Sequence, residues 1–294
     1  MKLLQVVFFL LAANIAAAKS IDYLPVSTNP TILANNNIVH KYYILSYNED
    51  YEQANWVYYS LTDSMVLNSG EERSNNFNVD KKVFTKSSKS SDYTKSGYDR
   101  GHLCPAGDMG FDPVAMKESF LMSNISPQSP DFNRGIWKEL ETQVRNWAKV
   151  EHRLYVVTGP VFKNNKGSIG KDRVLIPGYF YKIIYDPTDV PKLIAFVLPN
   201  EKSDRPLTDF AIATDEAEKL TGYDFFSQLP DDQENKLESR VQLAGWFAGY
   251  ASEASIAVEA KTKTVNNDIY FYMILVLVIL LVALFVYLKT KRRK

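Results

Sequence analysis

The chain has 294 residues, of which 46% are hydrophobic, and its 34 lysine and arginine residues balance its 34 aspartate and glutamate residues. This composition is ordinary for a globular protein, and the length allows one large domain or two small ones. The single cysteine, Cys104, excludes an internal disulfide. Because free cysteines are usually buried, we interpret Cys104 as a packing residue rather than as a nucleophile, although a histidine lies nearby in the sequence.

The first residues are typical of a secretory signal peptide. Lys2 precedes an apolar run over residues 3–13, and three alanines at residues 16–18 come before Lys19. We therefore predict a cleaved signal peptide over residues 1–18, followed by a linker over residues 19–37 that is rich in Asn, Thr and Pro. The alternative is a mitochondrial presequence, which needs an Arg-rich amphipathic stretch, and these residues contain none.

The middle of the chain alternates between strand and helix patterns. Segments rich in aromatic and β-branched residues predict strands at residues 39–47, 55–61, 154–158, 179–185 and 193–198. An Asp112-Pro113 start predicts a helix to about residue 122, and another is expected at residues 214–220. The main body is thus expected over residues 38–231.

The sequence YDRGH at residues 98–102 contains the best candidate for a general base. Imidazole titrates near neutral pH, so His102 could accept a proton from water. Gly101 is expected to allow a tight turn that directs His102 into a cleft. Asp99 could orient the histidine, and the planar guanidinium of Arg100 suits a phosphate.

A second polar group follows about thirty residues later. From Asn133 onward the chain is predicted to be helical, with an apolar stripe made of Ile136, Trp137, Leu140, Val144, Trp147 and Ala148. Glu141 and Arg145 lie just beyond one edge of that stripe. A neutral amide, a carboxylate and a guanidinium on one lip of a cleft suit a hydrated hard cation, which takes few protein ligands.

These motifs resemble the DNA/RNA non-specific endonucleases, the family of endonuclease G and the secreted sugar-nonspecific nucleases. The match covers residues 98–103, 120–128 and 156–160 together with Asn133, Trp137 and Glu141, and weaker similarity runs over residues 41–231. The resemblance implies an α+β fold, with a mainly antiparallel central sheet flanked by helices and a ββα-metal active site. Relatives often form dimers, so a homodimer is possible.

The resemblance also implies roles for individual residues. His102 would be the general base, Asn133 the one direct protein ligand of Mg²⁺ (or Mn²⁺), and Glu141 the holder of a metal-bound water. Arg73 and Arg145 would contact the phosphate. The substrate-binding residues are expected to be Asp99, Arg100 and Asn124.

The C-terminal part of the chain predicts a membrane anchor. Residues 269–288 contain no charged residue and could form about 30 Å of helix, enough to cross a bilayer core. The basic tail at residues 289–294 places the C-terminus in the cytoplasm by the positive-inside rule. With a juxtamembrane stalk over residues 232–268, these features predict a single-pass type I membrane protein whose domain is extracellular or in an organelle lumen.

The sequence thus predicts a membrane-anchored, Mg²⁺-dependent endonuclease that cleaves DNA and RNA to give 5′-phosphate ends. Without Lys2 and the five tail cations, 28 basic residues face 34 acidic residues, which disfavours tight binding of nucleic acid outside a local groove. Two alternatives are a catalytically silent nucleic-acid receptor and a phosphodiesterase of small nucleotides. If His102 is unperturbed, the rate should fall below a pH of about 6.5.

Overall fold

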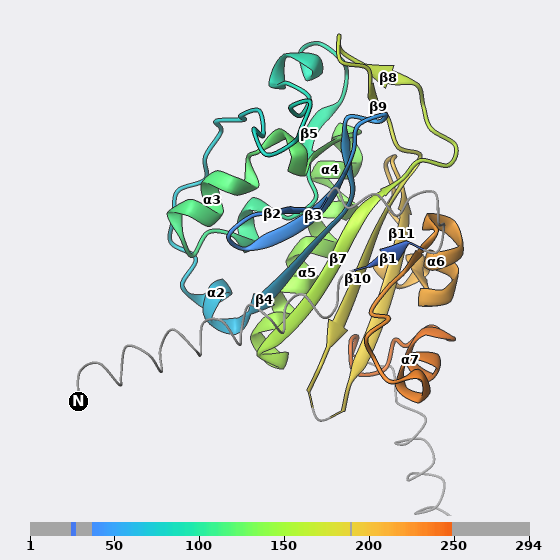
Figure 1. The fold of residues 1–294 in the computed structure, drawn as a ribbon. Helices are drawn as coiled ribbons and strands as arrows, with labels where there is room; N and C mark the ends of the chain where they lie inside the picture. Colours follow the sequence, from blue (N-terminus) through green and yellow to red (C-terminus); the bar gives the residue numbers. More distant parts are fainter. Residues whose placement is uncertain (1–24, 28–36, 189, 249–294) are drawn as a thin grey trace, which may run out of the picture. The chain divides into compact units, whose positions relative to one another are not determined.

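The computed structural model describes residues 25–27, 37–188 and 190–248 (Figure 1). The chain divides into two compact units, residues 1–246 and 247–294, and every helix and strand below belongs to the first. The predicted signal peptide (1–18), membrane helix (269–288) and basic tail (289–294) lie outside the described residues. Among the described residues, no helix has both the length and the apolar character needed to cross a bilayer.

A seven-stranded sheet in the order β12-β11-β10-β7-β4-β3-β2 forms the centre of the domain. Its neighbouring strands are all antiparallel, which confirms the predicted α+β class. The strands are β2 (Asn37–Val39), β3 (Tyr43–Asn48), β4 (Gln53–Thr62), β7 (Arg153–Val161), β10 (Tyr179–Asp186), β11 (Lys192–Pro199) and β12 (Ala211–Ile212). The strand predicted over residues 39–47 is in fact two strands, because the chain turns where the His40 N–H donates to the Tyr43 carbonyl.

The two faces of the sheet carry different helices. Side chains alternate along β10, so Tyr181, Ile183 and Tyr185 lie on one face and Phe180, Lys182 and Ile184 on the other. The first face packs against residues on and around α6 (Thr214–Thr221) and α7 (Asp231–Glu238), which lie together on one side of the sheet in Figure 1. The second face is covered by α5 (Ile136–Glu151), whose Trp137 ring lies 5.7 Å from that of Phe180.

The helix expected to begin at Asn133 is interrupted. The apolar stripe predicted from the sequence is buried on α5, but Asn133 belongs to a separate short helix, α4 (Pro130–Arg134). Gly135 divides the two, because its backbone leaves the helical region (ψ −116°) and a Cβ there would lie 2.4 Å from the carbonyl oxygen of Asp131. Asn133 is therefore oriented independently of α5.

Short elements complete the domain. The helix at Asp112 begins as predicted, since the Asp112 carboxylate accepts hydrogen bonds from the N–H groups of Val114 and Ala115, but α3 (Pro113–Ser119) ends earlier than expected. The other short elements are α2 (Asp63–Leu67), η1 (Ser90–Tyr93), η2 (Ala106–Asp108), η3 (Met122–Asn124), η4 (Leu207–Phe210), and the strand pairs β1 (Val26–Ser27) with β13 (Tyr223–Asp224), β5 (Asp99–His102) with β6 (Ile125–Gln128), and β8 (Ser168–Ile169) with β9 (Val174–Leu175).

The first residues of the expected stalk pack against the domain. Leu237 of α7 is buried in the core on the α6 side of the sheet. Trp246 is buried too, and the indole N–H of Trp147 donates to its carbonyl oxygen at 2.6 Å. Residues 241–248 form no helix. The folded unit therefore continues past the boundary that the sequence suggested at residue 231.

Candidate active site

Residues 98–134, which include the YDRGH motif, form two paired strands and later a short helix. β5 pairs antiparallel with β6, so that Asp99 lies opposite Gln128 and His102 opposite Ile125, and α4 begins two residues after β6. Gly101 is extended, with no positive φ, so the expected tight turn is wrong. A glycine is required there for a different reason: a Cβ would lie 2.2 Å from the side chain of Gln128.

His102 lies at the end of β5 in an aromatic pocket and is 7% exposed. The ring of Phe120 meets it edge-on at 4.7 Å, and that of Phe77 lies 5.7 Å away. Its Nε2 atom is buried and has no hydrogen-bond partner within the described protein. Burial, reinforced by the positive charge of Arg73, lowers the pKa of His102 to about 3. The imidazole is therefore neutral and has a lone pair available for a proton.

Asn133 is fixed in place by the strand that carries His102. Its amide nitrogen donates to Asp99 Oδ2 at 2.9 Å, and Arg134 donates to both oxygens of the same carboxylate at 2.8 and 2.6 Å. Burial raises the pKa of Asp99, but the hydrogen bonds from Arg134 and Asn133 outweigh it and hold that pKa below its usual value. With the amide nitrogen bound to Asp99, the amide oxygen is the atom that could bind a hard cation.

Glu141 of α5 is a partly buried carboxylate among several charges. Burial is the main cause that raises its pKa to about 7, and Asp108 adds to the effect. The positive charges of Lys182, Arg145 and Arg73 act in the opposite direction. Ionising Glu141 in the folded protein therefore costs free energy, and a cation beside the carboxylate would reduce that cost.

The two predicted phosphate-binding arginines differ in their surroundings. Arg145 donates to the buried carboxylate of Asp108 at 2.8 Å, and the Tyr59 hydroxyl donates to the other oxygen of that carboxylate. Arg73 is exposed and lies over the Phe120 ring at 5.2 Å, where its charge acts on both His102 and Glu141. Arg73 is therefore free to bind a phosphate, while Arg145 is a fixed positive charge.

The three residues expected to bind substrate have structural partners instead. Asn124 is fully buried, and its amide bonds the backbone of Cys104 in both directions and the carbonyl of Ser119. Arg100 donates to the carbonyl of Ser90 and packs between the rings of Phe77 and Tyr93. Asp99 orients Asn133, as described above. In this structure, Asn124 is fully buried, whereas Asp99 and Arg100 are partly exposed and also contact other residues of the protein.

The sequence analysis did not predict the buried lysine whose positive charge acts on Glu141. Lys182 of β10 is completely buried, its ammonium lies 4.7 Å from the Trp137 ring, and Nζ has no hydrogen-bond partner among the described residues. Burial lowers its pKa, against the attraction of Glu141 and Asp108. A lysine within the apolar strand sequence YFYKIIY was the signal, because a strand buried on both faces has no solvent-exposed position for a charge.

Other candidate residues lie outside this group or are inert. Cys104 is fully buried, and burial raises its pKa well above the usual value, which agrees with a packing role. His40 is buried and bonds Asp80 at 2.9 Å, whereas His152 is exposed and bonds Asp63 at 2.7 Å. The candidate site therefore consists of one neutral histidine, one amide, one carboxylate and two arginines.

Comparison with known proteins assigns this arrangement to a family. The family model described as DNA/RNA non-specific endonuclease matches residues 24–232. Nuclease C1 of Cunninghamella echinulata var. echinulata is 39% identical over 204 residues, which cover 64% of this chain and 81% of the relative. The mitochondrial nuclease of Saccharomyces cerevisiae is 33% identical over 219 residues, which cover 66% of this chain and 67% of the relative.

A solved structure agrees with the sequence relatives. The fold resembles a chain in the crystal structure of an EndoG/EndoGI complex, with a TM-score of 0.63 and 32% identity over 67% of this chain and 88% of that chain. Sequence and fold thus lead to the same enzymes, and the match spans the ββα motif and the central sheet. The chain belongs to the DNA/RNA non-specific endonuclease family and is a nuclease that hydrolyses nucleic acid.

Proposed function

We propose that the protein is a Mg²⁺-dependent endonuclease that cleaves DNA and RNA, with His102 as the general base. The main observation in support of this proposal is that β5 carries both His102 and the residue that orients Asn133. This strand holds a neutral histidine with an unpartnered Nε2 and, three residues earlier, the carboxylate that orients Asn133. This arrangement supports both proposed roles, because one short strand carries the proton acceptor and orients the cation ligand.

The donor set fits a hydrated cation. The amide oxygen of Asn133 would be the direct ligand, and Glu141 would hold a metal-bound water. Mg²⁺ normally keeps several waters and takes few protein ligands, so one amide and one nearby carboxylate are sufficient. When bound, the ion supplies positive charge beside the phosphate oxygens and the leaving oxygen.

The residues of the chain would perform the remaining steps. The His102 imidazole accepts a proton from the attacking water, whose oxygen forms a bond to phosphorus as the bond to the 3′ oxygen breaks. The leaving oxygen takes a proton from solvent, and the products carry a 5′-phosphate and a 3′-hydroxyl. Arg73 binds a phosphate oxygen at the exposed side of the site, and the Arg145 charge, held by Asp108, stabilises the negative charge that accumulates in the transition state.

The position of His102 changes the expected pH dependence. An unperturbed histidine would lose its function as a base below a pH of about 6.5. Because the pKa of His102 is lowered to about 3, the imidazole stays unprotonated in neutral and mildly acidic compartments. In the metal-free protein the pKa of Glu141 is raised to about 7, so protonation of this carboxylate would oppose cation binding, and thereby lower the rate, before His102 is protonated.

We further propose that the nuclease domain lies outside the cytoplasm and that residues 269–288 anchor it. The uncharged segment and the basic tail support a type I orientation. The yeast relative is named a mitochondrial nuclease, which supports an organelle lumen as one location. The apolar residues 1–18, with no Arg-rich stretch, favour the secretory route instead.

The test compares the purified full-length protein with two histidine variants. Wild type should cleave plasmid DNA and RNA with Mg²⁺ and lose this activity in EDTA. His102→Ala should lose at least about 10²-fold in rate, the usual scale of general-base catalysis, while still binding DNA. His152→Ala, which changes an exposed histidine outside the site, should cleave like wild type.

Two results would contradict the proposal. Equal cleavage by wild type and His102→Ala would remove the assigned base. Cleavage of dinucleotides but not of plasmid or RNA would instead favour the phosphodiesterase of small nucleotides.

A further inference from the structure

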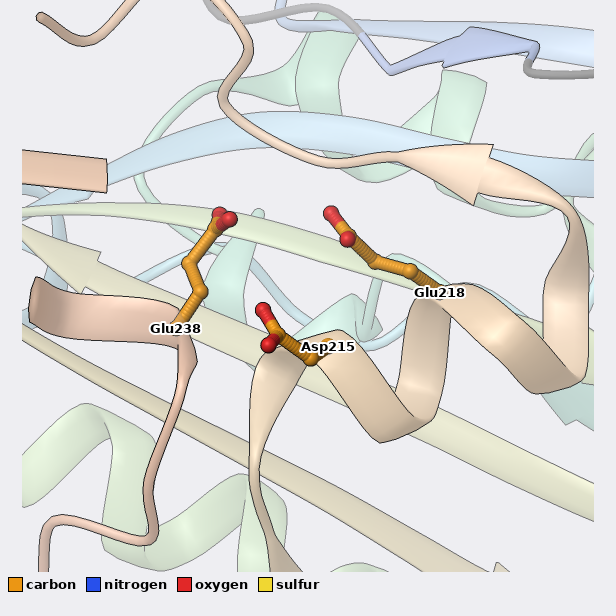
Figure 2. A group of neighbouring side chains, drawn as sticks. All are labelled: Asp215, Glu218 and Glu238. Carbon is orange, nitrogen blue, oxygen red and sulfur yellow. The ribbon is translucent and has the colours of Figure 1, made fainter. Parts of the chain in front are cut away.

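A second group of acidic side chains lies on the other face of the sheet from the nuclease site. Asp215 and Glu218 come from α6, and Glu238 is the last residue of α7. One carboxylate oxygen from each residue lies within 4.8 Å of the others, and Figure 2 shows the three carboxylates turned toward a common space. The helices α6 and α7 pack on the face opposite α5, so this group is separate from Glu141 and Asn133.

Glu238 provides an independent observation that a ligand is missing from this group. Its residue is 4% exposed, and its Oε1 atom is buried without a hydrogen-bond partner among the described residues. A buried carboxylate without a partner is costly, because it loses its hydration and gains nothing in return. The Glu238 carboxylate points toward those of Asp215 and Glu218, which can offer it no compensating charge (Figure 2).

The surroundings add negative charge. Burial raises the pKa of Glu238 to about 9 and that of Glu218 to about 7. Neighbouring carboxylates raise both pKa values further, whereas the hydrogen bond from the Phe225 N–H lowers that of Glu218. Asp224 of β13 acts on both groups, and so does Glu234 of α7. Among the described residues, the ion pairs include none with Asp215, Glu218 or Glu238.

The group is also partly preorganised. Asp215 and Glu218 are three residues apart on one helix, which places them on the same side of α6. The Oε1 atom of Glu218 accepts a hydrogen bond from the Phe225 N–H at 2.8 Å, so this side chain is held by the loop after the helix. The neighbouring Ala217 and Leu237 are buried in one core cluster, so α6 and α7 are packed on the same support.

We propose that Asp215, Glu218 and Glu238 form a site for one divalent cation, and that its chemistry suits Ca²⁺. Three carboxylates offer up to six oxygen ligands, and Ca²⁺ takes six to eight oxygens at about 2.3–2.6 Å in a flexible geometry. Two oxygens on opposite sides of Ca²⁺ are therefore roughly 4.6–5.2 Å apart, and the three oxygens here, all within 4.8 Å of one another, are close enough to bind one ion. Mg²⁺ needs a tighter octahedron and holds its own water more strongly.

The cation would link α6 to the end of α7. It would neutralise carboxylates that otherwise repel one another, and it would fasten the last helix of the domain to the sheet. Its role would be structural, because the nuclease residues lie on the opposite face. The site does not depend on the proposed nuclease mechanism.

The test uses full-length protein stripped of metal with a chelator and then dialysed free of the chelator. Isothermal titration with CaCl₂ should show a binding event that Glu238→Gln weakens at least tenfold. Thermal unfolding should show a Tm increase of about 5–10 °C at a free Ca²⁺ concentration a hundredfold above the Kd. MgCl₂ at the same concentration should give a smaller increase.

Three variants make the result specific. Glu216→Gln removes an exposed carboxylate from the same helix and should keep the full Ca²⁺ response. Asn133→Ala removes the nuclease-site ligand and should keep it too. Glu238→Gln should unfold at about the wild-type Tm without Ca²⁺, because glutamine resembles the protonated carboxyl group that a pKa of about 9 implies at neutral pH, which distinguishes loss of the site from misfolding.

Three results would overturn the proposal. The first is a wild-type Tm that Ca²⁺ does not change. The second is a Ca²⁺ response of equal size in Glu238→Gln. The third is a response that only Asn133→Ala abolishes, which would place the ion in the nuclease site.

Discussion

Replacing Glu141 with glutamine should inactivate the enzyme and, at neutral pH, stabilise its fold. Glu141 is partly buried on α5, and its pKa is raised from 4.5 to about 7. Glutamine resembles the protonated side chain and carries no charge to bury. The variant should therefore lose the carboxylate that we assign to a metal-bound water and also lose the cost of ionising it.

The sign of this effect depends on pH. Below the unfolded pKa of 4.5, both the folded and the unfolded chain hold the proton, so wild type and variant should be equally stable. As the pH rises from 4.5 to about 7, the unfolded chain ionises while the folded chain keeps the proton, so wild type loses stability. Above pH 7 the difference should stay constant.

The size follows from the same pKa. A change of one in pKa corresponds to about 1.4 kcal/mol, so the rise from 4.5 to about 7 sets a ceiling of roughly 3 kcal/mol. Because water reaches part of the side chain, we expect about 1–2 kcal/mol of stabilisation in Glu141→Gln at pH 8.

Urea unfolding at pH 4, 6 and 8 in EDTA would measure this difference, since EDTA removes any cation that stabilises the ionised carboxylate. The matched control is Glu139→Gln, an exposed carboxylate on the same helix, which should change stability by less than about 0.5 kcal/mol at all three pH values. A Glu141→Gln protein that is less stable than wild type at pH 8, or equally shifted at pH 4 and pH 8, would refute the reasoning.

Three further predictions concern the ββα motif. NMR titration of His102 should give a pKa below 5, since burial favours the neutral ring, and a measured midpoint near 6.5 would contradict the buried position. Asp99→Ala should raise the Mg²⁺ concentration for half-maximal cleavage about 10- to 100-fold by releasing Asn133, whereas Asp131→Asn, an exposed neighbour, should not. Gly135→Ala should destabilise the domain by about 1–3 kcal/mol in urea unfolding, because its Cβ would overlap the Asp131 carbonyl, and an unchanged midpoint would show that the chain relaxes freely there.

Local sequence patterns identified the sheet and the main helix well. The strand predicted at residues 179–185 became β10, and the stripe on α5 is buried as its spacing indicated. These patterns work because burial against a sheet selects apolar residues at a fixed period. The break at Gly135 was missed, since a single glycine does not show whether a helix continues or divides, and only contact with the Asp131 carbonyl excludes a side chain there.

Resemblance suggested candidate site residues, but it did not suggest the side chains and backbone groups that contact them. Asn124 lies inside a conspicuous motif, yet its amide bonds the backbone around Cys104, so motif membership did not separate support from substrate contact. Lys182 lies about forty residues beyond Glu141 in sequence and meets the site only because β10 passes beneath α5. The topology of the fold brings such pairs together, and a short stretch of sequence cannot reveal it.

The burial of Trp246 has a practical consequence for anyone who shortens the chain. The part that this protein shares with its family ends at residue 232, but the indole of Trp147 on α5 is covered by Trp246, at 4.8 Å between the rings. A recombinant fragment cut at the family boundary would lose α7 and uncover that indole, and we expect it to aggregate during purification. A fragment that extends to residue 246 should remain monodisperse, because residues 233–246 belong to the folding unit.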